Sequence, residues 1–542
     1  MRICCVHCKL ASTFQKLGHE VLVLNPGPGF YQLAPVLEKN KFSPDLLFQQ
    51  ETLGARTLIA DLEDISCPRI YWSIDTHLNT FWQQYYARLF DLVLATQREW
   101  LPYLANSRGT KLGWLPWFGF KRPWTAWETR KYQTSFVGRI TKHRPLRKNF
   151  TDFLTQDFKT HVCQEIPYQQ MLGLYSNSKI VPNESILGEI NFRLFEATSS
   201  GCLVCNQDSG QGLEELFVPG QEIMLFSHVL ELKGLLNYFL KHSDQACHMA
   251  AAARERVQKE HLPQHRAEYV LKMAREISAK KLSHNDAQTA LWLTALQLWD
   301  AGRLELNIDA VMRILFALPL DPELLASLMR LYFNKKSEAE ILALLVPVLQ
   351  KEQYAESWLV NLTGSHICLG LDKWEMACRF WLRYAYKQKK GKLERPRDAG
   401  HLYQLWAGEL LSLGYVLRPG FLFDSSRHTP CSALDCLLTA YELKPKDLDL
   451  ARQIDKLLSR YRGMESTRLG LLSYLSLQQP KDWKCALELG LVNLRAFRER
   501  QGLEELFLAQ KRATEKQEQE KFLRSLSRRD KSGQLTRLFS SN

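Results

Sequence analysis

The sequence contains no run of about 18 or more apolar residues, which argues against a membrane-spanning helix. Its first residues, MRICCVHCKLASTFQKLGHE, also lack the apolar core of a secretory signal peptide. The 13 cysteines are spread thinly over 542 residues, as expected for free thiols in a reducing compartment. These absences predict a cytoplasmic protein with at most peripheral membrane contact.

The signatures of several common enzyme classes are missing as well. The chain has no Walker loop, no His-Glu-x-x-His zinc motif and no Gly-x-Ser-x-Gly nucleophile motif. Two Cys-x-x-Cys pairs, one of them Cys202/Cys205, fall in predicted strands, and neither has a histidine at zinc-ligand spacing. The sequence Asp447-Leu448-Asp449 lies in a predicted helical region. We therefore expect neither a metal nor a cofactor.

The charge of the chain is strongly positive. Lys and Arg outnumber Asp and Glu by 71 to 58, which gives a formal net charge of +13. This balance favours anionic partners, among them nucleotide-sugars, phospholipid surfaces and nucleic acid. Nucleic acid is the least favoured of the three, because the chain has no aromatic-basic motif of the kind that binds it.

Residues 1–120 alternate short apolar runs with helical segments, a pattern typical of a doubly wound parallel sheet. Asp75 and His77 directly follow the apolar run Arg69–Ile74, at the strand end where such sheets bind ligands. They are candidates for a catalytic pair that deprotonates or orients an acceptor hydroxyl. The alternative is that Asp75 caps the next helix and His77 is a surface loop residue.

A second lobe is expected over residues 121–281. Its first strand, Thr134–Arg139, ends in Gly138-Arg139 and leads into a short basic loop that contains Arg144. Glycine lets the backbone approach a phosphate, and arginine can bind one through two hydrogen bonds. Arg139 is the first candidate for a diphosphate ligand and Arg144 is the second.

The stretch Val181–Phe226 carries the densest set of polar candidates. A strand gives way to a polar, Gly-containing loop, and Glu189–Ser200 then has helical periodicity. Glu196 lies between apolar neighbours in that helix, where a charge needs a partner. A carboxylate can accept hydrogen bonds from the two hydroxyls of a ribose, and the N–H groups at the helix start can bind a diphosphate. The alternative is an ordinary packed helix, with Glu189 and Arg193 as a surface pair.

This stretch resembles the C-terminal domain of GT-B glycosyltransferases, in particular the CgeB-like group. The pattern stands here as Asn191, Arg193, Phe195-Glu196-Ala197, Gly201, Gly212 and Glu222-Ile223. Where the wider group has the first of two glutamates, this chain has Gly188, followed by Glu189. The resemblance implies that Glu196 binds the donor ribose and that the acceptor enters near Asp75. It also implies a donor loop formed by Gly188, Glu189, Asn191 and Arg193, with arginine and the helix dipole neutralising the diphosphate in place of a metal.

Residues 286–509 place apolar residues at helical spacing in successive blocks, without strand-like runs. Ser432–Pro445 resembles the second helix of a tetratricopeptide repeat, so we expect a degenerate α-solenoid that binds proteins along one face. The alternative is a plain helical domain or a dimerisation element. Residues 510–542 are rich in charge and are expected to form a frayed helix or a disordered tail.

These features together predict an α/β fold of the GT-B type, with two Rossmann-like lobes followed by a helical repeat-like domain. The predicted function is a hexosyltransferase-like glycosyltransferase with a nucleotide-sugar as co-substrate. Its acceptor would be a protein or a glycan, such as bacterial surface or flagellar material, recruited by the helical repeats. The alternative is a non-catalytic protein-binding scaffold with a degenerate glycosyltransferase module. Gly188 at the first glutamate position and the absence of a glycine-rich first loop favour that alternative.

Overall fold

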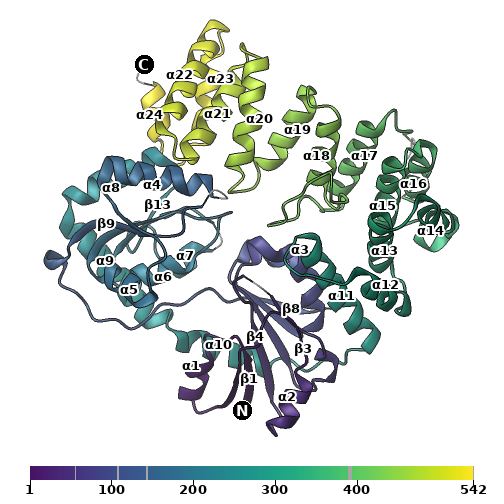
Figure 1. The fold of residues 1–542 in the computed structure, drawn as a ribbon. Helices are drawn as coiled ribbons and strands as arrows, with labels where there is room; N and C mark the ends of the chain where they lie inside the picture. Colours follow the sequence, from purple (N-terminus) through teal and green to yellow (C-terminus); the bar gives the residue numbers. More distant parts are fainter. Residues whose placement is uncertain (55, 106–108, 142–143, 211, 389–393, 541–542) are drawn as a thin grey trace. The chain divides into compact units, whose positions relative to one another are not determined.

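The computed structural model describes residues 1–542 apart from 55, 106–108, 142–143, 211, 389–393 and 541–542 (Figure 1). The chain forms two compact units. The first comprises Met1–Leu115 and Ala267–Leu450, and the second comprises Pro116–Arg266 and Ala451–Asn542. Each unit therefore combines two segments that are far apart in the sequence.

The first unit is built on a six-stranded parallel sheet with the strand order β2-β1-β4-β6-β7-β8. Its strands are β1 Arg2–Val6, β2 Glu20–Leu24, β4 Leu46–Gln50, β6 Arg69–Ser73, β7 Leu92–Ala95 and β8 Lys111–Trp114. In register, Cys4 of β1 lies opposite Leu22 of β2 and Leu47 of β4. Strands β3 Gly29–Tyr31 and β5 Thr57–Ile59 form a separate parallel pair. Because all strands of the large sheet are parallel, their carboxyl ends meet at one edge.

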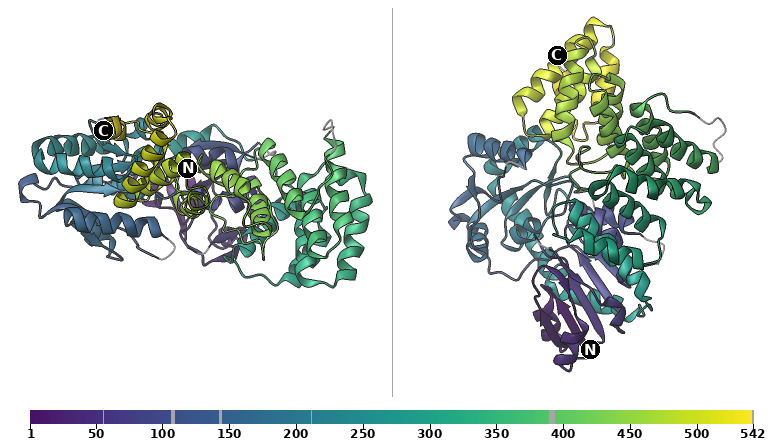
Figure 2. Two further views of the ribbon diagram at one scale, coloured as in Figure 1. Left: turned by 90° about the horizontal axis from the view of Figure 1, so that it is seen from above. Right: turned by 45° about the vertical axis from the view of Figure 1, so that its right-hand side comes forward.

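Helices connect these strands and continue into the later part of the unit. The connecting helices are α1 Ala11–Lys16, α2 Ala34–Lys39 and α3 Thr76–Tyr86. The later ones are α11 His284–Asp300, α12 Ile308–Ala317, α13 Pro322–Lys335, α14 Glu338–Gln350, α15 Trp358–Gly370, α16 Trp374–Lys387, α17 Ala399–Ser412 and α18 Ala433–Leu443. Neighbouring members of this series pack side by side (Figures 1 and 2). Leu291 and Leu298 of α11 share a core with Phe81 and Tyr86 of α3, which joins the helices to the sheet.

The second unit contains a five-stranded parallel sheet with the order β10-β9-β11-β12-β13. Its strands are β9 Tyr132–Val137, β10 His161–Cys163, β11 Ser178–Asn183, β12 Leu203–Gln207 and β13 Met224–Phe226. Its first helices are α4 Pro145–Phe158, α5 Tyr168–Ser176, α6 Phe192–Ser199, α7 Leu213–Leu216, α8 Val229–Lys241 and α9 Ser243–Glu260, and α10 Pro263–Arg275 crosses into the first unit. Two parallel sheets with helices, followed by a long helical region, confirm the expected α/β fold class.

The C-terminal helices complete the core of the second unit. They are α19 Leu448–Leu458, which crosses the unit boundary, and then α20 Glu465–Gln478, α21 Trp483–Arg495, α22 Glu499–Glu515, α23 Gln519–Ser527 and α24 Gln534–Ser540. Phe522, Leu526 and Phe539 are fully buried in one core with Phe136 and Phe226 of the sheet.

Two expectations about domain organisation change as a result. The segment over 510–542 was expected as a frayed helix or a disordered tail, but up to residue 540 it contains the end of α22, α23 and α24, because its apolar residues recur four positions apart, as in Phe522/Leu526 and Leu535/Phe539, and make a buried stripe. The helical region expected as one domain over 286–509 is divided between the two units at Leu450.

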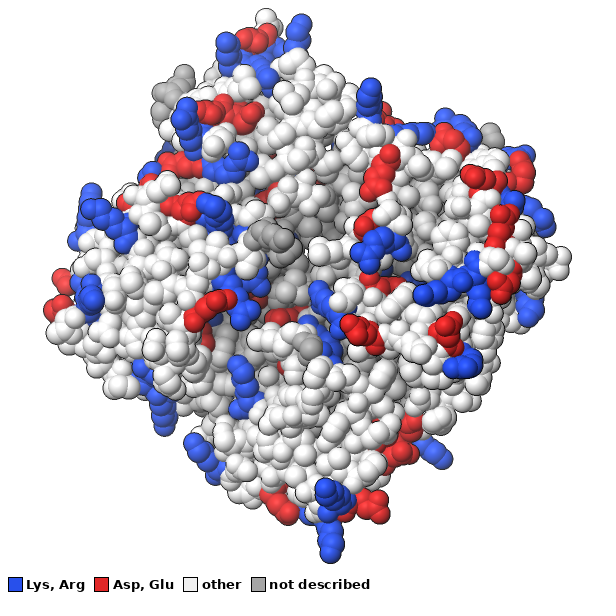
Figure 3. Space-filling model, in the orientation of Figure 1, with Lys and Arg blue, Asp and Glu red and all other residues white. Residues whose placement is uncertain are grey.

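The surface is mixed in charge. On the face drawn in Figure 3, Lys and Arg side chains are interspersed with Asp and Glu over both units. Within the described ranges, no helix has the length and apolar character needed to cross a membrane.

Candidate functional site

The loop between β11 and α6 forms the centre of the carboxyl edge of the second sheet. Leu187 and Gly188 both have positive φ angles, of 50° and 75°, so the loop turns sharply there. Asn191 ends the loop as the N-cap of α6, and its side chain accepts a hydrogen bond from Leu194 N at 3.2 Å. The helix therefore begins at Phe192, three residues later than the periodicity of the sequence indicated.

A network of amide and guanidinium groups fastens this loop to the sheet. Asn183, the last residue of β11, donates through Nδ2 to Asn206 Oδ1 at 2.6 Å and to Asn191 Oδ1 at 3.0 Å. Arg193 donates through Nη1 to Asn183 Oδ1 at 2.6 Å and through Nε to the carbonyl of Val137 at 3.0 Å. These contacts span three strands, so Asn191 and Arg193 position the edge of the sheet.

Gly138 provides the space that Arg193 occupies. A Cβ atom at position 138 would lie 2.9 Å from Arg193 Nη2 and equally close to the ring of Phe136. The guanidinium lies 4.3 Å from the centre of that ring. The sequence had suggested that Gly138 makes room for a phosphate, whereas in this structure the neighbouring space holds two side chains of the protein itself.

Arg147 and Glu184 form a buried ion pair beneath the loop. Arg147 Nη2 donates to Glu184 Oε2 at 3.0 Å, Arg147 Nε also contacts Glu184, and both side chains are almost fully buried. Burial acts to lower the pKa of Arg147, but the hydrogen bond and charge of Glu184 raise it above its ordinary value. Sequence reasoning did not find this pair, since nothing in the chain links two residues 37 positions apart.

Glu196 is a buried carboxylate on α6, with an exposed fraction of 6%. Tyr168, the first residue of α5, lies beside it. The pKa of Tyr168 is raised, first by its own burial and then by the charge of Glu196. Tyr168 is still 42% exposed as a residue, so the pair combines a buried acceptor with a partly accessible aromatic side chain. Sequence reasoning named Glu196 but missed Tyr168, whose position after Pro167 at a helix start was the available signal.

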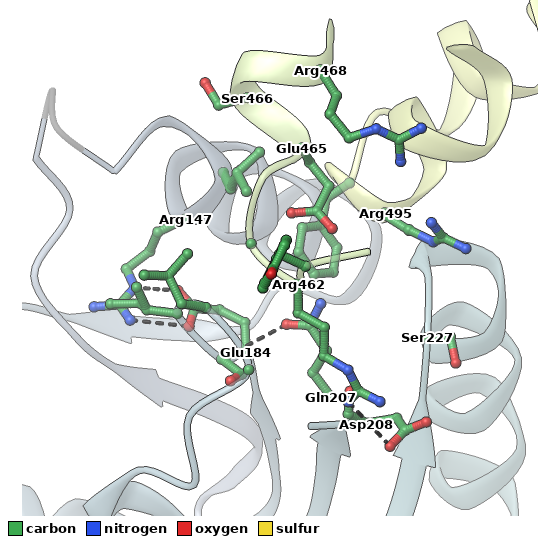
Figure 4. Close-up of a pocket in the computed structure, with 18 of the residues that line it drawn as sticks. Arg147, Glu184, Gln207, Asp208, Ser227, Arg462, Glu465, Ser466, Arg468 and Arg495 are labelled. Carbon is green, nitrogen blue, oxygen red and sulfur yellow. Dashed lines mark hydrogen bonds and ion pairs between the residues drawn. The ribbon is translucent and has the colours of Figure 1, made fainter. Parts of the chain in front are cut away.

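The remaining predicted donor residues differ in their surroundings. Arg139 is exposed on the loop after β9, and Glu189 is half-buried, with its backbone carbonyl accepting a hydrogen bond from Ser185 Oγ at 2.7 Å. Arg144 and Gly188 line a cavity of about 410 Å³ at the same edge (Figure 4). Among the described residues that line this cavity, none of the other predicted donor residues occurs.

In the first unit, Asp75 and His77 lie at the carboxyl end of β6, where α3 begins. Asp75 is the N-cap residue of α3 by position, but Glu51 accepts the hydrogen bonds of Ile74 N at 2.8 Å and Asp75 N at 2.9 Å. Burial raises the pKa of Glu51, and the charge of Arg56 partly opposes that shift. His77 is fully buried, so the alternative of a surface histidine is wrong. Glu51 was missed, although it ends the polar run Gln49-Gln50-Glu51 directly after a buried strand.

Two groups of residues of the metal-ligating type contain carboxylates that accept backbone hydrogen bonds near helix starts. His228, Glu231 and Asp530 of the second unit place ligand-type atoms within 4.8 Å of one another. Glu231 Oε2 accepts from Ser227 N at 2.5 Å, and Asp530 Oδ2 accepts from Thr536 N at 2.7 Å. Asp447 Oδ1 likewise accepts from Asp449 N and Leu450 N at 3.0 Å, at the start of α19.

Part of the second unit matches the sequence model of a known protein family. Residues 125–272 match the sequence model of a family described as glycosyl transferase-like. The match covers strands β9–β13 and every predicted donor residue from Gly138 to Glu196. A comparison with curated protein sequences found no match.

Several solved structures share part of the fold. A glycosyltransferase from Rickettsia africae has 13% identity and a TM-score of 0.37, over 51% of this chain and 98% of that one. The sucrose-phosphate synthase of Thermosynechococcus elongatus has 11% identity and a TM-score of 0.38, over 51% and 98%. HepE of Anabaena, in complex with UDP, has 12% identity and a TM-score of 0.36, over 51% and 100%.

The TM-scores of these superpositions are low, so the relation to glycosyltransferases rests on the sequence match alone. It covers the second sheet. Residues 125–272 are similar to the glycosyl transferase-like family.

Proposed function

We propose that this chain is a glycosyltransferase that binds a nucleotide-sugar at the carboxyl edge of the second sheet. The observation that carries the proposal is Glu196, a buried carboxylate beside the partly accessible side chain of Tyr168, inside the segment that matches the glycosyl transferase-like family. The carboxylate would accept both hydroxyls of the donor ribose, and the Tyr168 ring would offer a face for stacking the base.

The diphosphate would lie where α6 begins. The positive end of the α6 dipole lies at this edge, and Arg139 is exposed on the adjacent loop. Arg144, at the start of α4, is the second cation. With these groups neutralising the leaving diphosphate, the proposed mechanism requires neither a metal nor a cofactor. The HepE structure contains UDP, which makes UDP-linked sugars the first donors to test.

For the acceptor, we propose a protein or a glycan that receives a hexose. Its hydroxyl would bind near Asp75 and His77, at the carboxyl end of β6. The packed helices α11–α18 would act as a degenerate repeat that holds a protein partner.

A ligand-binding experiment tests the donor site directly. The melting temperature of the full chain is measured with UDP-, GDP-, ADP- and CMP-linked sugars, for the wild type, Glu196→Gln and the matched control Glu214→Gln, an exposed glutamate on α7. A ligand at about a hundred times its dissociation constant stabilises the folded state by roughly 2.7 kcal/mol. We expect one nucleotide class to stabilise the wild type and the control but not Glu196→Gln. Stabilisation that survives in Glu196→Gln would contradict the assignment of the ribose ligand.

The second candidate is a non-catalytic scaffold. Its specific support is that Gly138 and Arg193 are engaged in internal packing, while Gly188 occupies the position of the first glutamate of related enzymes. This function predicts that none of the four donor classes raises the melting temperature and that no nucleoside diphosphate is released on incubation with them.

A further inference from the structure

The cavity of about 410 Å³ in the second unit has a strongly basic lining. Eight Arg and Lys residues and three Asp and Glu residues contribute to it. Arg144 and Arg147 come from the start of α4, whereas Arg462, Arg495 and Lys531 come from the C-terminal segment. Figure 4 labels Arg147, Arg462 and Arg495 among the residues around this space. Two stretches more than 300 residues apart therefore bring positive charge to one space.

Most of these cations already have partners. Arg147 pairs with Glu184. Lys531 Nζ lies 3.0 Å from Asp208 Oδ2, and Arg462 also contacts Asp208. Burial acts to raise the pKa of Asp208, but Lys531 and Arg462 together hold it below its usual value.

Glu488, which is outside the described lining, is likewise shared between two cations. Arg468 Nη2 lies 3.2 Å from Glu488 Oε2, and Arg529 Nη2 lies 2.6 Å from Glu488 Oε1. Arg468 also pairs with Asp455, at 2.7 Å. Even when Glu488 and Asp455 are counted with the three lining carboxylates, eight cations face five anions. The cavity therefore has an excess of positive charge.

Arg495 belongs to the lining and forms no ion pair with the described carboxylates. In the described part of the chain, no carboxylate forms a salt bridge with its guanidinium, which is partly buried at the end of α21. Burial lowers its pKa, the charges of Glu465 and Glu488 oppose that shift, and the charges of Arg468 and Arg529 add to it. A partly buried cation without an ion pair is stabilised when an anion enters.

The first turns of two helices also line the cavity. Residues of the first turn of α4 and of α20, each 14 residues long, are among those that line it. Their N-cap residues, Arg144 and Met464, are both described, and neither makes a capping hydrogen bond through its side chain. Helix N-termini carry partial positive charge and favour anions, which adds to the charge of the side chains.

We propose that this cavity binds a small molecule carrying a phosphate group, at a site that adjoins the proposed nucleotide-sugar site and shares Arg144 and Gly188 with it. Its volume suits a small metabolite. A phosphate, with two negative charges and several acceptor oxygens, matches an array of guanidinium groups better than a single carboxylate does. Glu196 and Tyr168 do not belong to the described lining, whereas Glu184 and Gly188 do, so the ligand would contact the loop that leads into α6.

The test is a calorimetric titration of the full chain with inorganic phosphate and with pyrophosphate, in chloride buffer of matched ionic strength. We expect saturable binding that is at least about tenfold weaker in Arg495→Gln, because a charge-assisted hydrogen bond is lost. Arg500→Gln, at a side chain that is 87% exposed on α22, is the matched control and should bind like the wild type. Glu465→Gln should bind more tightly, because it removes a negative charge from the lining.

Two further variants keep the result decisive. Arg139→Gln removes the proposed diphosphate ligand that does not line the cavity, and it should bind phosphate like the wild type, so the failure of the donor site and the failure of the cavity are distinguishable. If the melting temperature without ligand shows that Arg495→Gln is unfolded, Arg460→Gln, at an exposed position of the lining, replaces it. Binding that is absent or not saturable in the wild type, unchanged in Arg495→Gln or its replacement Arg460→Gln, or lost in Arg139→Gln would overturn the proposal. Competition by glucose 6-phosphate distinguishes a phosphate ester from free phosphate as the natural ligand.

Discussion

His261 shows how one buried ring can hold a loop of the second unit in place. It is 4% exposed, and its Nε2 lies 2.7 Å from the carbonyl oxygen of Leu216. Arg266 Nη2 donates to its Nδ1 at 3.1 Å, and Arg266 also donates to the carbonyl of Trp117 at 2.9 Å. Because Nδ1 accepts from Arg266, Nε2 must carry the hydrogen of the neutral ring. The arrangement requires an uncharged histidine, and burial, followed by the charge of Arg266, lowers the pKa of His261 to about 4.

This residue predicts a loss of stability in mild acid. The folded-state pKa is about 4, below the ordinary value of 6.5, so between these values the unfolded chain binds more protons than the folded protein. Stability is therefore full above the ordinary pKa and falls as the pH drops towards 4, by about 3 kcal/mol from this group. Urea unfolding at pH 7 and pH 4.5 should show a smaller pH effect for His261→Gln than for the wild type. An equal pH effect in both proteins would contradict this account.

Single residues also show what the sequence could and could not predict at the site. Glu196 stood out because a charge between apolar neighbours in a helix needs a reason, and the structure places it in a buried position. The partners of Arg147 and Asp208 could not be predicted, because Glu184 and Lys531 approach them only through the tertiary fold. Lys531 lies 323 positions from Asp208. No periodicity in the sequence carries that information.

Among the elements, those with an amphipathic or purely apolar pattern were predicted and the others were missed. The strands of both sheets appeared as short apolar runs. The sequence of helix α15 shows no clear helical periodicity, because Val360–Ser365 is buried at every position and so gives no alternation between an apolar and a polar face. The helices after residue 510 were hidden by their high charge, although their few apolar residues lie on one stripe.

Helix α23 should therefore contribute strongly to stability. Leu526 is fully buried in the core of the second unit, so Leu526→Ala should lower the free energy of unfolding by about 3 kcal/mol, as is typical when a large core residue is truncated. The matched control is Leu477→Ala on α20, at a leucine that is 78% exposed. Urea unfolding followed by tryptophan fluorescence measures both changes. Equal effects of the two substitutions would show that α23 does not belong to the core.

At the scale of the whole molecule, each unit has its own hydrophobic core. Leu526 belongs to the core of the second unit, whereas Leu296 of α11 belongs to a cluster of the first. We expect Leu526→Ala to accelerate amide hydrogen exchange mainly in β9–β13, and Leu296→Ala to accelerate it in the helices of the first unit. Hydrogen exchange with mass spectrometry measures both patterns. Acceleration over the entire chain in either variant would mean that the two cores unfold as one.

The alternation of segments between the two units also has a consequence for the time at which the protein can fold. The first sheet is complete once residue 115 has been made, but its unit also needs residues 267–450. A ribosome adds roughly 5–20 residues per second, so the apolar face that receives α11 and its successors waits for tens of seconds during synthesis. Over that interval the nascent chain exposes surface that chaperones recognise, and a slower rate of translation lengthens the exposure.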